Sequence, residues 1–139
     1  MQKNIAKMSI GLSVSVRDRD GKLVKQVFDP IIYRGDFLPC TRNRTYRTTK
    51  QSQTAVNLRV YAGEQTFVED NLELGNFVIE KIPKNDVGKE KVDVTFHLDK
   101  DLMLYISLKV KSTGREETRV IDTKIMQEDI RVFNKLYNR

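Results

Sequence analysis

The segment from residue 51 to residue 64, QSQTAVNLRVYAGE, constrains the fold more than any other part of this chain. Its apolar side chains recur at every second position, the spacing at which side chains share one face of a β-strand. One face would carry Val56, Leu58 and Val60, and the other would carry Asn57, Arg59 and Tyr61. A glycine follows at position 63, as is typical of turns. The segment therefore predicts a strand with one buried face that ends at a glycine turn.

The same alternation recurs along most of the chain. Turn residues separate the alternating segments, among them the Asp20-Gly21 pair, and an Asp29-Pro30 pair is expected to break one strand. The predicted strands cover residues 10–17, 23–28, 31–33, 41–48, 55–61, 76–81, 92–98, 104–110 and 118–122, with a long loop at 83–90. Many short strands at near-regular spacing predict a mainly β fold, an antiparallel β-sandwich or a partly open barrel.

The periodicity changes after residue 123. Met126, Ile130, Phe133 and Tyr137 recur at helical spacing, with acidic side chains early and basic ones late in the segment. This pattern predicts a short C-terminal α-helix over residues 124–139, after a sandwich domain over residues 1–123. A helix of this length is marginal alone in water, so its apolar stripe is expected to dock on other protein.

Composition narrows the class of protein. A chain of 139 residues fits one domain, and its net charge of +6 would favour an acidic partner if the charge were gathered on one face. Acidic and basic residues are interleaved instead, as in the run RDRD at 17–20. Cys40 is the only cysteine, which excludes an intrachain disulfide and favours a reducing, cytoplasmic location. No segment has the roughly 20 apolar residues of a membrane span.

The inventory of catalytic groups is thin. The chain has one histidine and one cysteine, and it has none of the common hydrolase, zinc-protease or phosphate-binding motifs. His97 lies in an alternating strand and is expected to be exposed or satisfied by a neighbour. We therefore predict no enzyme activity and no metal site in this chain.

Five motifs together resemble a known family. RGDFLP at 34–39, the 51–64 segment, EDNLELGNF at 69–77, VDVTFHLD at 92–99 and STGRE at 112–116 occur in the order and near the spacing of the peptide-binding β-subdomain of the Hsp70 chaperones. The similarity covers residues 9–123. It implies a β-sandwich that holds an extended peptide by its backbone and sinks one aliphatic side chain into a pocket.

The resemblance also implies site residues. By position, the pocket would be lined by Leu12, Val14, Tyr46, Val56, Leu58 and Val92, although ordinary core packing is the alternative for each. The two residues that bridge over the peptide in the family correspond to Ser15 and Thr49, both small and polar. The turn after the first strand is longer than in the family, and the 83–88 loop lacks the family's pattern.

The family likeness further implies partners. Hydrophobic unfolded polypeptides would be the ligands, and residues 124–139 would begin a helical lid. A J-domain co-chaperone and a nucleotide-binding domain carrying ATP and Mg²⁺ would belong to the parent protein, so no cofactor is expected in this chain.

Two other functions remain open at this point. Arg42, Arg44 and Tyr46 share one strand face, an arrangement that can hold single-stranded nucleic acid, although charges that protect an edge strand from aggregation are the favoured explanation. The apolar stripe at 126–137 would alternatively serve a non-catalytic docking module.

Overall fold

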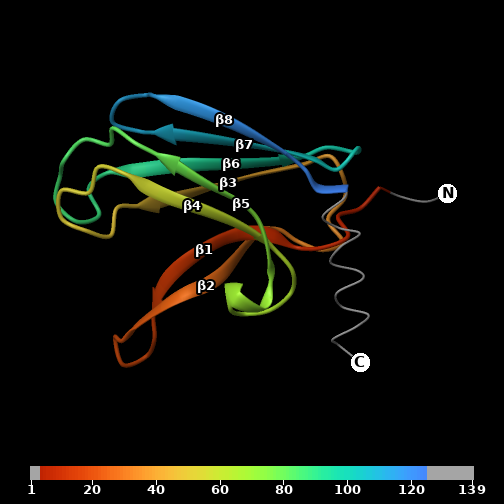
Figure 1. Cartoon of the computed structure of the whole chain (residues 1–139), viewed down its shortest axis with the longest axis horizontal. Helices are drawn as coiled ribbons and strands as arrows, with labels where there is room; N and C mark the ends of the chain where they lie inside the picture. Colours follow the sequence, from red (N-terminus) through yellow and green to blue (C-terminus); the bar gives the residue numbers. More distant parts are fainter. Residues whose placement is uncertain (1–3, 125–139) are drawn as a thin grey trace.

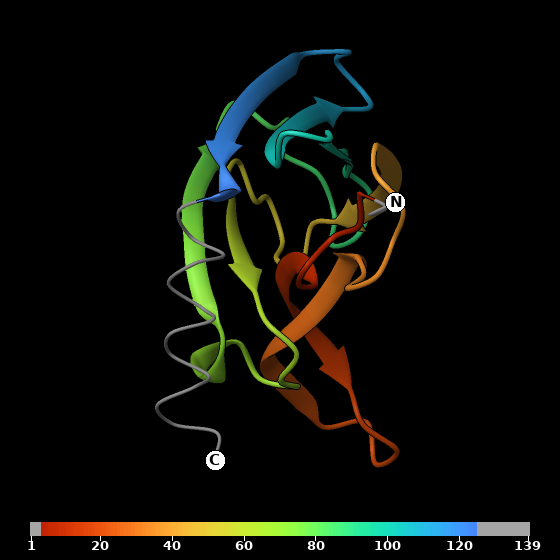
Figure 2. The same ribbon diagram turned by 90° about the vertical axis from the view of Figure 1, so that its right-hand side faces the viewer.

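Residues 4–124 are described by a computed structural model, which contains two four-stranded antiparallel sheets packed face to face (Figures 1 and 2). The first sheet has the order β2-β1-β4-β5 and the second the order β3-β6-β7-β8. The strands are β1 (Ile10–Arg17), β2 (Leu23–Ile32), β3 (Cys40–Arg47), β4 (Val56–Ala62), β5 (Leu72–Ile79), β6 (Lys91–Leu98), β7 (Met103–Val110) and β8 (Glu116–Asp122). A 3-10 turn, η1 (Val68–Asp70), lies between β4 and β5. The predicted β-sandwich is confirmed.

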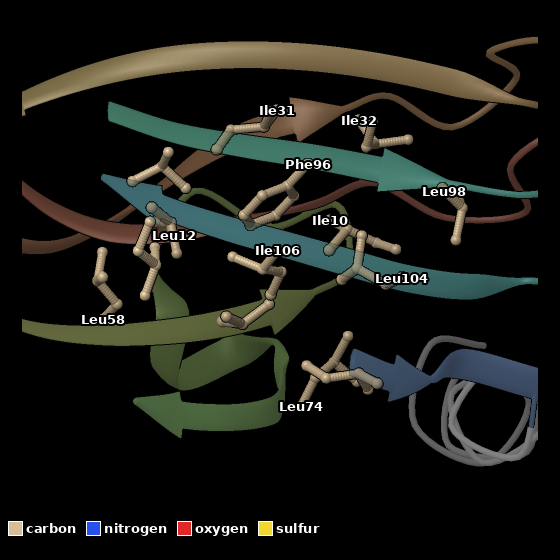
Figure 3. Close-up of a cluster of buried hydrophobic side chains, with 14 of the residues drawn as sticks. Ile10, Leu12, Ile31, Ile32, Leu58, Leu74, Phe96, Leu98, Leu104 and Ile106 are labelled. Atoms are coloured by element: carbon tan, nitrogen blue, oxygen red, sulfur yellow. The ribbon is translucent and has the colours of Figure 1, made fainter. Parts of the chain in front are cut away.

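The inner faces of the two sheets form one hydrophobic core (Figure 3). Strands β6 and β7 alternate strictly between buried and more exposed residues, which is why their sequences read so clearly as strands. Their buried positions meet apolar side chains from the first sheet. The labelled members of this core are Ile10, Leu12, Ile31, Ile32, Leu58, Leu74, Phe96, Leu98, Leu104 and Ile106.

Polar contacts join the sheets along both sides. Between the edge strands β2 and β3, Arg42 donates to the Ile31 carbonyl at 3.0 Å and the Tyr46 hydroxyl donates to Asp29 Oδ2 at 2.8 Å. On the other side, between β5 and β8, the guanidinium carbon of Arg119 lies 5.9 Å from the centroid of the Phe77 ring. The edges of the sandwich are therefore fixed by directional contacts as well as by the core.

The turn between β1 and β2 confirms the prediction at Asp20-Gly21. Gly21 has φ of 77°, which a glycine adopts readily, and its N–H donates to the Asp18 carbonyl at 3.0 Å. Asp18 Oδ1 also accepts the backbone N–H groups of Asp20 and Lys22, each at 2.9 Å. The carboxylate thus organises the turn.

Strand β2 differs from the prediction, because it runs unbroken through Asp29-Pro30. The expected break was wrong for a physical reason. Proline cannot donate a hydrogen bond, but β2 is an edge strand, where a missing donor is tolerated. Pro30 lies opposite Gly11 of β1, and the N–H of Phe28 donates to the Thr66 carbonyl at 2.8 Å.

In the second half of the chain, one predicted boundary differs from the structure and one predicted loop agrees with it. Strand β5 begins at Leu72, earlier than residue 76, whereas the long loop at 83–90 is found between β5 and β6. The helix predicted over 124–139 falls, apart from Lys124, outside the described residues. Thr123 and Lys124 have helical conformation.

Gly11 provides a test of how tightly β1 and β2 approach. A Cβ at this position would lie 2.0 Å from the Asp29 carbonyl oxygen and 2.6 Å from the Pro30 Cα. Because both are backbone atoms, Gly11→Ala should lower the free energy of unfolding by about 1–3 kcal/mol, measured by urea denaturation. Ser13→Ala, on the same strand face, is the control and should change it little. Equal stability of the two variants would contradict the close approach.

Candidate functional site

Strands β1 and β4 pair over only three positions before they separate. The pairs are Ile10 with Ala62, Gly11 with Tyr61, and Leu12 with Val60. From residue 13 onward β1 pairs with β2 alone, and residues 56–59 of β4 pair with β5 alone. Within residues 4–124, the facing edges of these two stretches therefore have no strand between them. We call the region between these edges the wedge, and its apex is Leu12, the last residue of β1 that pairs with β4. Figure 1 shows β1 and β4 running apart.

The predicted pocket residues differ in how deeply they are buried. Leu12, Leu58 and Val92 are only 2%, 6% and 1% exposed and belong to the core. Tyr46 and Val56 are partly buried and pack against that core. Val14 is half-buried and lies further along β1. Contact of these side chains with a ligand stays a prediction.

The two predicted bridging residues lie at the rim. Ser15 is exposed on the part of β1 that borders the wedge. Thr49 is exposed in the connection between β3 and β4, where its backbone N–H donates to Gln53 Oε1 at 2.9 Å. Both side chains are small, and a bridge between them stays a prediction.

Tyr46 carries a polar link at the apex. Its hydroxyl donates to Asp29 Oδ2, and Asp29 lies opposite Leu12 in the β1–β2 ladder. Burial, together with the neighbouring carboxylate, raises the pKa of the Tyr46 hydroxyl far above its ordinary value, so it remains a hydrogen-bond donor. Sequence reasoning missed Asp29 because it interpreted Asp29-Pro30 as a strand break. The two-residue spacing from Val27 through Asp29 to Ile31 could have revealed it.

The loop between β3 and β4 is held by the loop that precedes β6. The N–H of Thr48 donates to the Glu90 carbonyl at 3.0 Å, and the Thr48 carbonyl accepts the N–H of Gly88 at 3.0 Å. The Glu90 carboxylate accepts hydrogen bonds from the Ser112 hydroxyl and from Asn85 Nδ2. These two bonds lower the pKa of the Glu90 carboxyl below its ordinary 4.5, the Ser112 bond having the larger effect.

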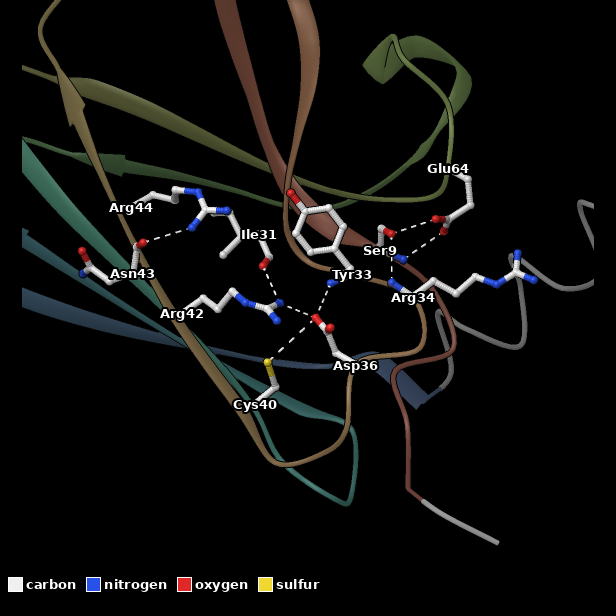
Figure 4. A network of polar contacts seen from close by, with 10 residues as sticks. All are labelled: Ser9, Ile31, Tyr33, Arg34, Asp36, Cys40, Arg42, Asn43, Arg44 and Glu64. Atoms are coloured by element: carbon white, nitrogen blue, oxygen red, sulfur yellow. Dashed lines mark hydrogen bonds and ion pairs between the residues drawn. The ribbon is translucent and has the colours of Figure 1, made fainter.

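The strand face that suggested nucleic-acid binding is committed to contacts within the protein (Figure 4). Arg42 pairs with Asp36, and this hydrogen bond is the main cause that lowers the pKa of the Asp36 carboxyl. The guanidinium carbon of Arg42 lies 5.5 Å from the centroid of the Tyr33 ring. Arg44 donates to the Asn43 carbonyl at 3.2 Å. With the Tyr46 hydroxyl also engaged, the structure does not favour the nucleic-acid alternative.

A second network in Figure 4 ties the entry to β1 to the end of β4. The Ser9 hydroxyl donates to Glu64 Oε1 at 2.7 Å and accepts the Arg34 N–H at 3.0 Å. The Ser9 backbone N–H donates to Glu64 Oε2 at 2.9 Å. These bonds tie the residue before β1 to the residues after β4, next to the end at which the two strands pair.

The remaining candidate groups have structural surroundings. His97 Nδ1 lies 2.6 Å from the Thr41 hydroxyl, so the expectation of a satisfied side chain is confirmed. Burial raises the pKa of the Cys40 thiol, which keeps it protonated. In the described part of the chain, no three histidine, cysteine, aspartate or glutamate side chains are grouped to hold a metal. The same residues contain no helix that is long and apolar enough to span a membrane.

Comparisons with known proteins agree with the family resemblance. A family model described as "Hsp70 protein" matches residues 10–135. The "Chaperone protein DnaK" of Thermosipho melanesiensis is 36% identical over 106 residues, which cover 75% of this chain and 18% of the relative. The protein of the same name from Anaplasma marginale is 35% identical over 107 residues, covering 76% and 17%. The chain thus spans less than a fifth of the length of these curated relatives.

The hydroxyl of Tyr46 can be removed without changing the size of the ring. Tyr46→Phe leaves the Asp29 carboxylate without this donor, so the free energy of unfolding should fall by about 1–3 kcal/mol in urea denaturation. Tyr105→Phe, at a position 38% exposed on the outer face of β7, is the control and should shift it by less than about 0.5 kcal/mol. A matching loss in both variants would rule out a special role for the link.

The Glu90 carboxyl makes the stability of the fold depend on pH in a defined direction. Its folded-state pKa lies below the ordinary value, so its bonds stabilise the fold fully above pH 4.5 and are lost as the pH falls through the folded-state pKa. Glu90→Gln should therefore be less stable than wild type at about pH 6, and the gap should narrow by about pH 3.5. Urea midpoints at both pH values measure this. A gap that widens on acidification would contradict it.

Proposed function

Because this chain belongs to the Hsp70 family, we propose that it is the peptide-binding β-subdomain of an Hsp70-type chaperone and holds extended hydrophobic segments of unfolded client polypeptides. In this proposal residues 1–123 form the binding sandwich and residues 124–139 begin the lid. The relatives are named chaperone proteins, which agrees with such a role.

The wedge is the observation that carries the proposal. Two strand edges, at residues 13–17 and 56–59, diverge from one apex and lack ladder partners on their facing sides within the described residues. Free strand edges bind extended chains through backbone hydrogen bonds, which tolerate many sequences. The apolar side chains at the apex would supply selectivity for an aliphatic residue. Broad binding of extended apolar segments follows.

The energetics favour modest affinity. Burying one leucine side chain contributes about 1.5–3 kcal/mol, whereas micromolar affinity needs about 8 kcal/mol. Backbone hydrogen bonds and further apolar contacts must therefore supply the rest. The small rim residues Ser15 and Thr49 would leave a bound segment uncovered, so rapid release is expected from this domain alone.

This function includes no chemical step within the chain. ATP binding and hydrolysis with Mg²⁺, and the J-domain co-chaperone, would involve parts of the relatives that this chain does not span. Nucleotide-driven opening of the lid is likewise proposed for the parent protein. The docking alternative at 126–137 lies outside the described residues.

Val56 offers the most direct test of the pocket. It is the first residue of β4, partly buried, and borders the wedge. Val56→Phe should occupy the open part of the wedge beside β4 and weaken binding of a fluorescent leucine-centred heptapeptide by at least about tenfold in fluorescence polarisation, a loss of about 1.4 kcal/mol.

A matched control is available on the neighbouring strand. Val78→Phe makes the same chemical change at a position 48% exposed on β5, and it should leave peptide affinity unchanged. Circular dichroism and thermal melting check that both variants fold. Full binding by a folded Val56→Phe protein would remove this part of the wedge from the site.

A further inference from the structure

The β1–β2 hairpin continues beyond the apex of the wedge and carries apolar side chains that the core does not use. Val14 lies opposite Val27, and Val16 lies opposite Val24. Residues directly opposite in an antiparallel pair have side chains on the same face, so all four valines share one face of the hairpin. We call Val14, Val16, Val24 and Val27 the valine surface. Leu12, on the same face of β1, marks where the core ends.

A bulge in β2 creates this surface. Val24 and Val27 are three residues apart, a spacing that would put them on opposite faces of a regular strand. The pairing register shifts between Val14 and Val16, and Gln26 has φ of 59°, an unfavourable conformation for a residue other than glycine. Such strained positions persist where the surroundings determine them and concentrate at functional sites. The extra residue aligns the two valines.

The valine surface remains partly open to solvent. Val16 is 43% exposed, and the other three valines are half-buried. They stand beside the unpaired edge of β1 at residues 13–17. An extended segment paired with that edge would direct every second side chain toward the same face. Val14 is also one of the predicted pocket residues, so the surface is continuous with the proposed peptide site, from Leu12 at the apex to Val16 at the hairpin end.

Charge on the hairpin indicates what kind of segment fits there. Four basic residues, at positions 17, 19, 22 and 25, accompany two acidic ones, Asp18 and Asp20. The turn holds one charge of each sign, because the Asp18 carboxylate accepts two backbone N–H groups and the Arg17 guanidinium donates to the Gly21 carbonyl at 2.9 Å, so the balance on the hairpin stays positive. The hairpin end therefore favours an acidic residue in a bound segment.

We propose that the valine surface is a second subsite, which selects client segments with two aliphatic residues separated by an even number of positions and an acidic residue at the hairpin end. The inference rests on the proposed function. Between Leu12 and Val16 the strand advances about 13 Å, so a second aliphatic residue two or four positions from the first reaches the surface. A residue three positions away points to the other face.

The spacing rule can be tested with the full chain by comparing peptides in which two leucines are an even or an odd number of positions apart. Alanine-based fluorescent peptides would carry one anchor leucine and a second leucine two, three or four positions away, on either side of the anchor. We expect at least one even spacing to tighten binding about fivefold to tenfold over the single-leucine peptide, since part of a leucine is buried. The spacing of three should give less than about twofold.

Two protein variants locate the effect on the hairpin. The double variant V16S/V24S should lose the gain from the second leucine while it still binds single-leucine peptides. Leu23→Ser is the matched control, because Leu23 is 41% exposed and lies opposite Arg17 on the other face of the hairpin. It should keep the gain. A glutamate at the hairpin end of the peptide should bind more tightly than a lysine, and high salt should reduce the difference.

The outcomes separate this inference from the proposed function. If single-leucine peptides bind but no even spacing helps, or if V16S/V24S keeps the gain, the second subsite is overturned and the peptide site remains. If no peptide binds at all, both the second subsite and the proposed function are overturned. A wild-type chain that dimerises at micromolar concentration in light scattering, with the dimer lost in V16S/V24S, would assign the surface to a second copy and overturn the inference.

Discussion

The separation of β1 from β4 at Leu12 is the constraint on which the candidate site depends. Up to that residue, β1 contributes Ile10 and Leu12 to the core between the sheets, and pairing with β4 keeps the first sheet continuous. Beyond it, neither Val14 nor Val16 belongs to the core. Burial of apolar surface therefore no longer holds β1 against β4, and the strand follows its hairpin partner β2 instead. The wedge results from a core that ends before its strands do.

Directional contacts then fix what borders the wedge. Tyr46 reaches from β3 to Asp29 on β2, which couples the second sheet to the strand that diverges. Glu90 anchors the loop after β3 through its backbone, while its carboxylate binds Ser112 and Asn85. Hydrogen bonds of this kind contribute modestly to stability, yet they define the positions of their partners. Buried polar groups thus fix the loops and strands that border the wedge, and apolar packing fixes the core beneath them.

Much of the architecture could be predicted from the sequence, because period-two alternation reports directly which residues of a strand are buried. The turn at Asp20-Gly21 and the strands β6 and β7 are examples. Alternation says nothing about which strands pair, so the separation of β1 from β4 could not be foreseen. Pro30 misled the prediction, because a proline that breaks a central strand is tolerated at an edge.

The site could be predicted only in part. The apolar positions at the apex followed from the family resemblance, and the structure does bring Leu12, Leu58 and Val92 into one cluster with Tyr46 and Val56 beside it. The link from Tyr46 to Asp29 depends on how two sheets meet, which local patterns do not encode. The bulge at Gln26 was equally hidden, since a glutamine gives no warning of a positive φ.

The edge position of Pro30 has a consequence for self-assembly. A domain that recruits extended chains risks recruiting its own copies into polymers, and exposed strand edges are where such growth begins. On the outer margin of β2, Pro30 has no hydrogen to offer a newcomer, and Phe28 already gives its own to Thr66. This margin is therefore poorly suited to templating another strand. Within the described residues, the edge of β1 beyond Leu12 has no such protection, so the proposed pairing with an extended segment would occur on the inner side of the hairpin and not on its outer margin.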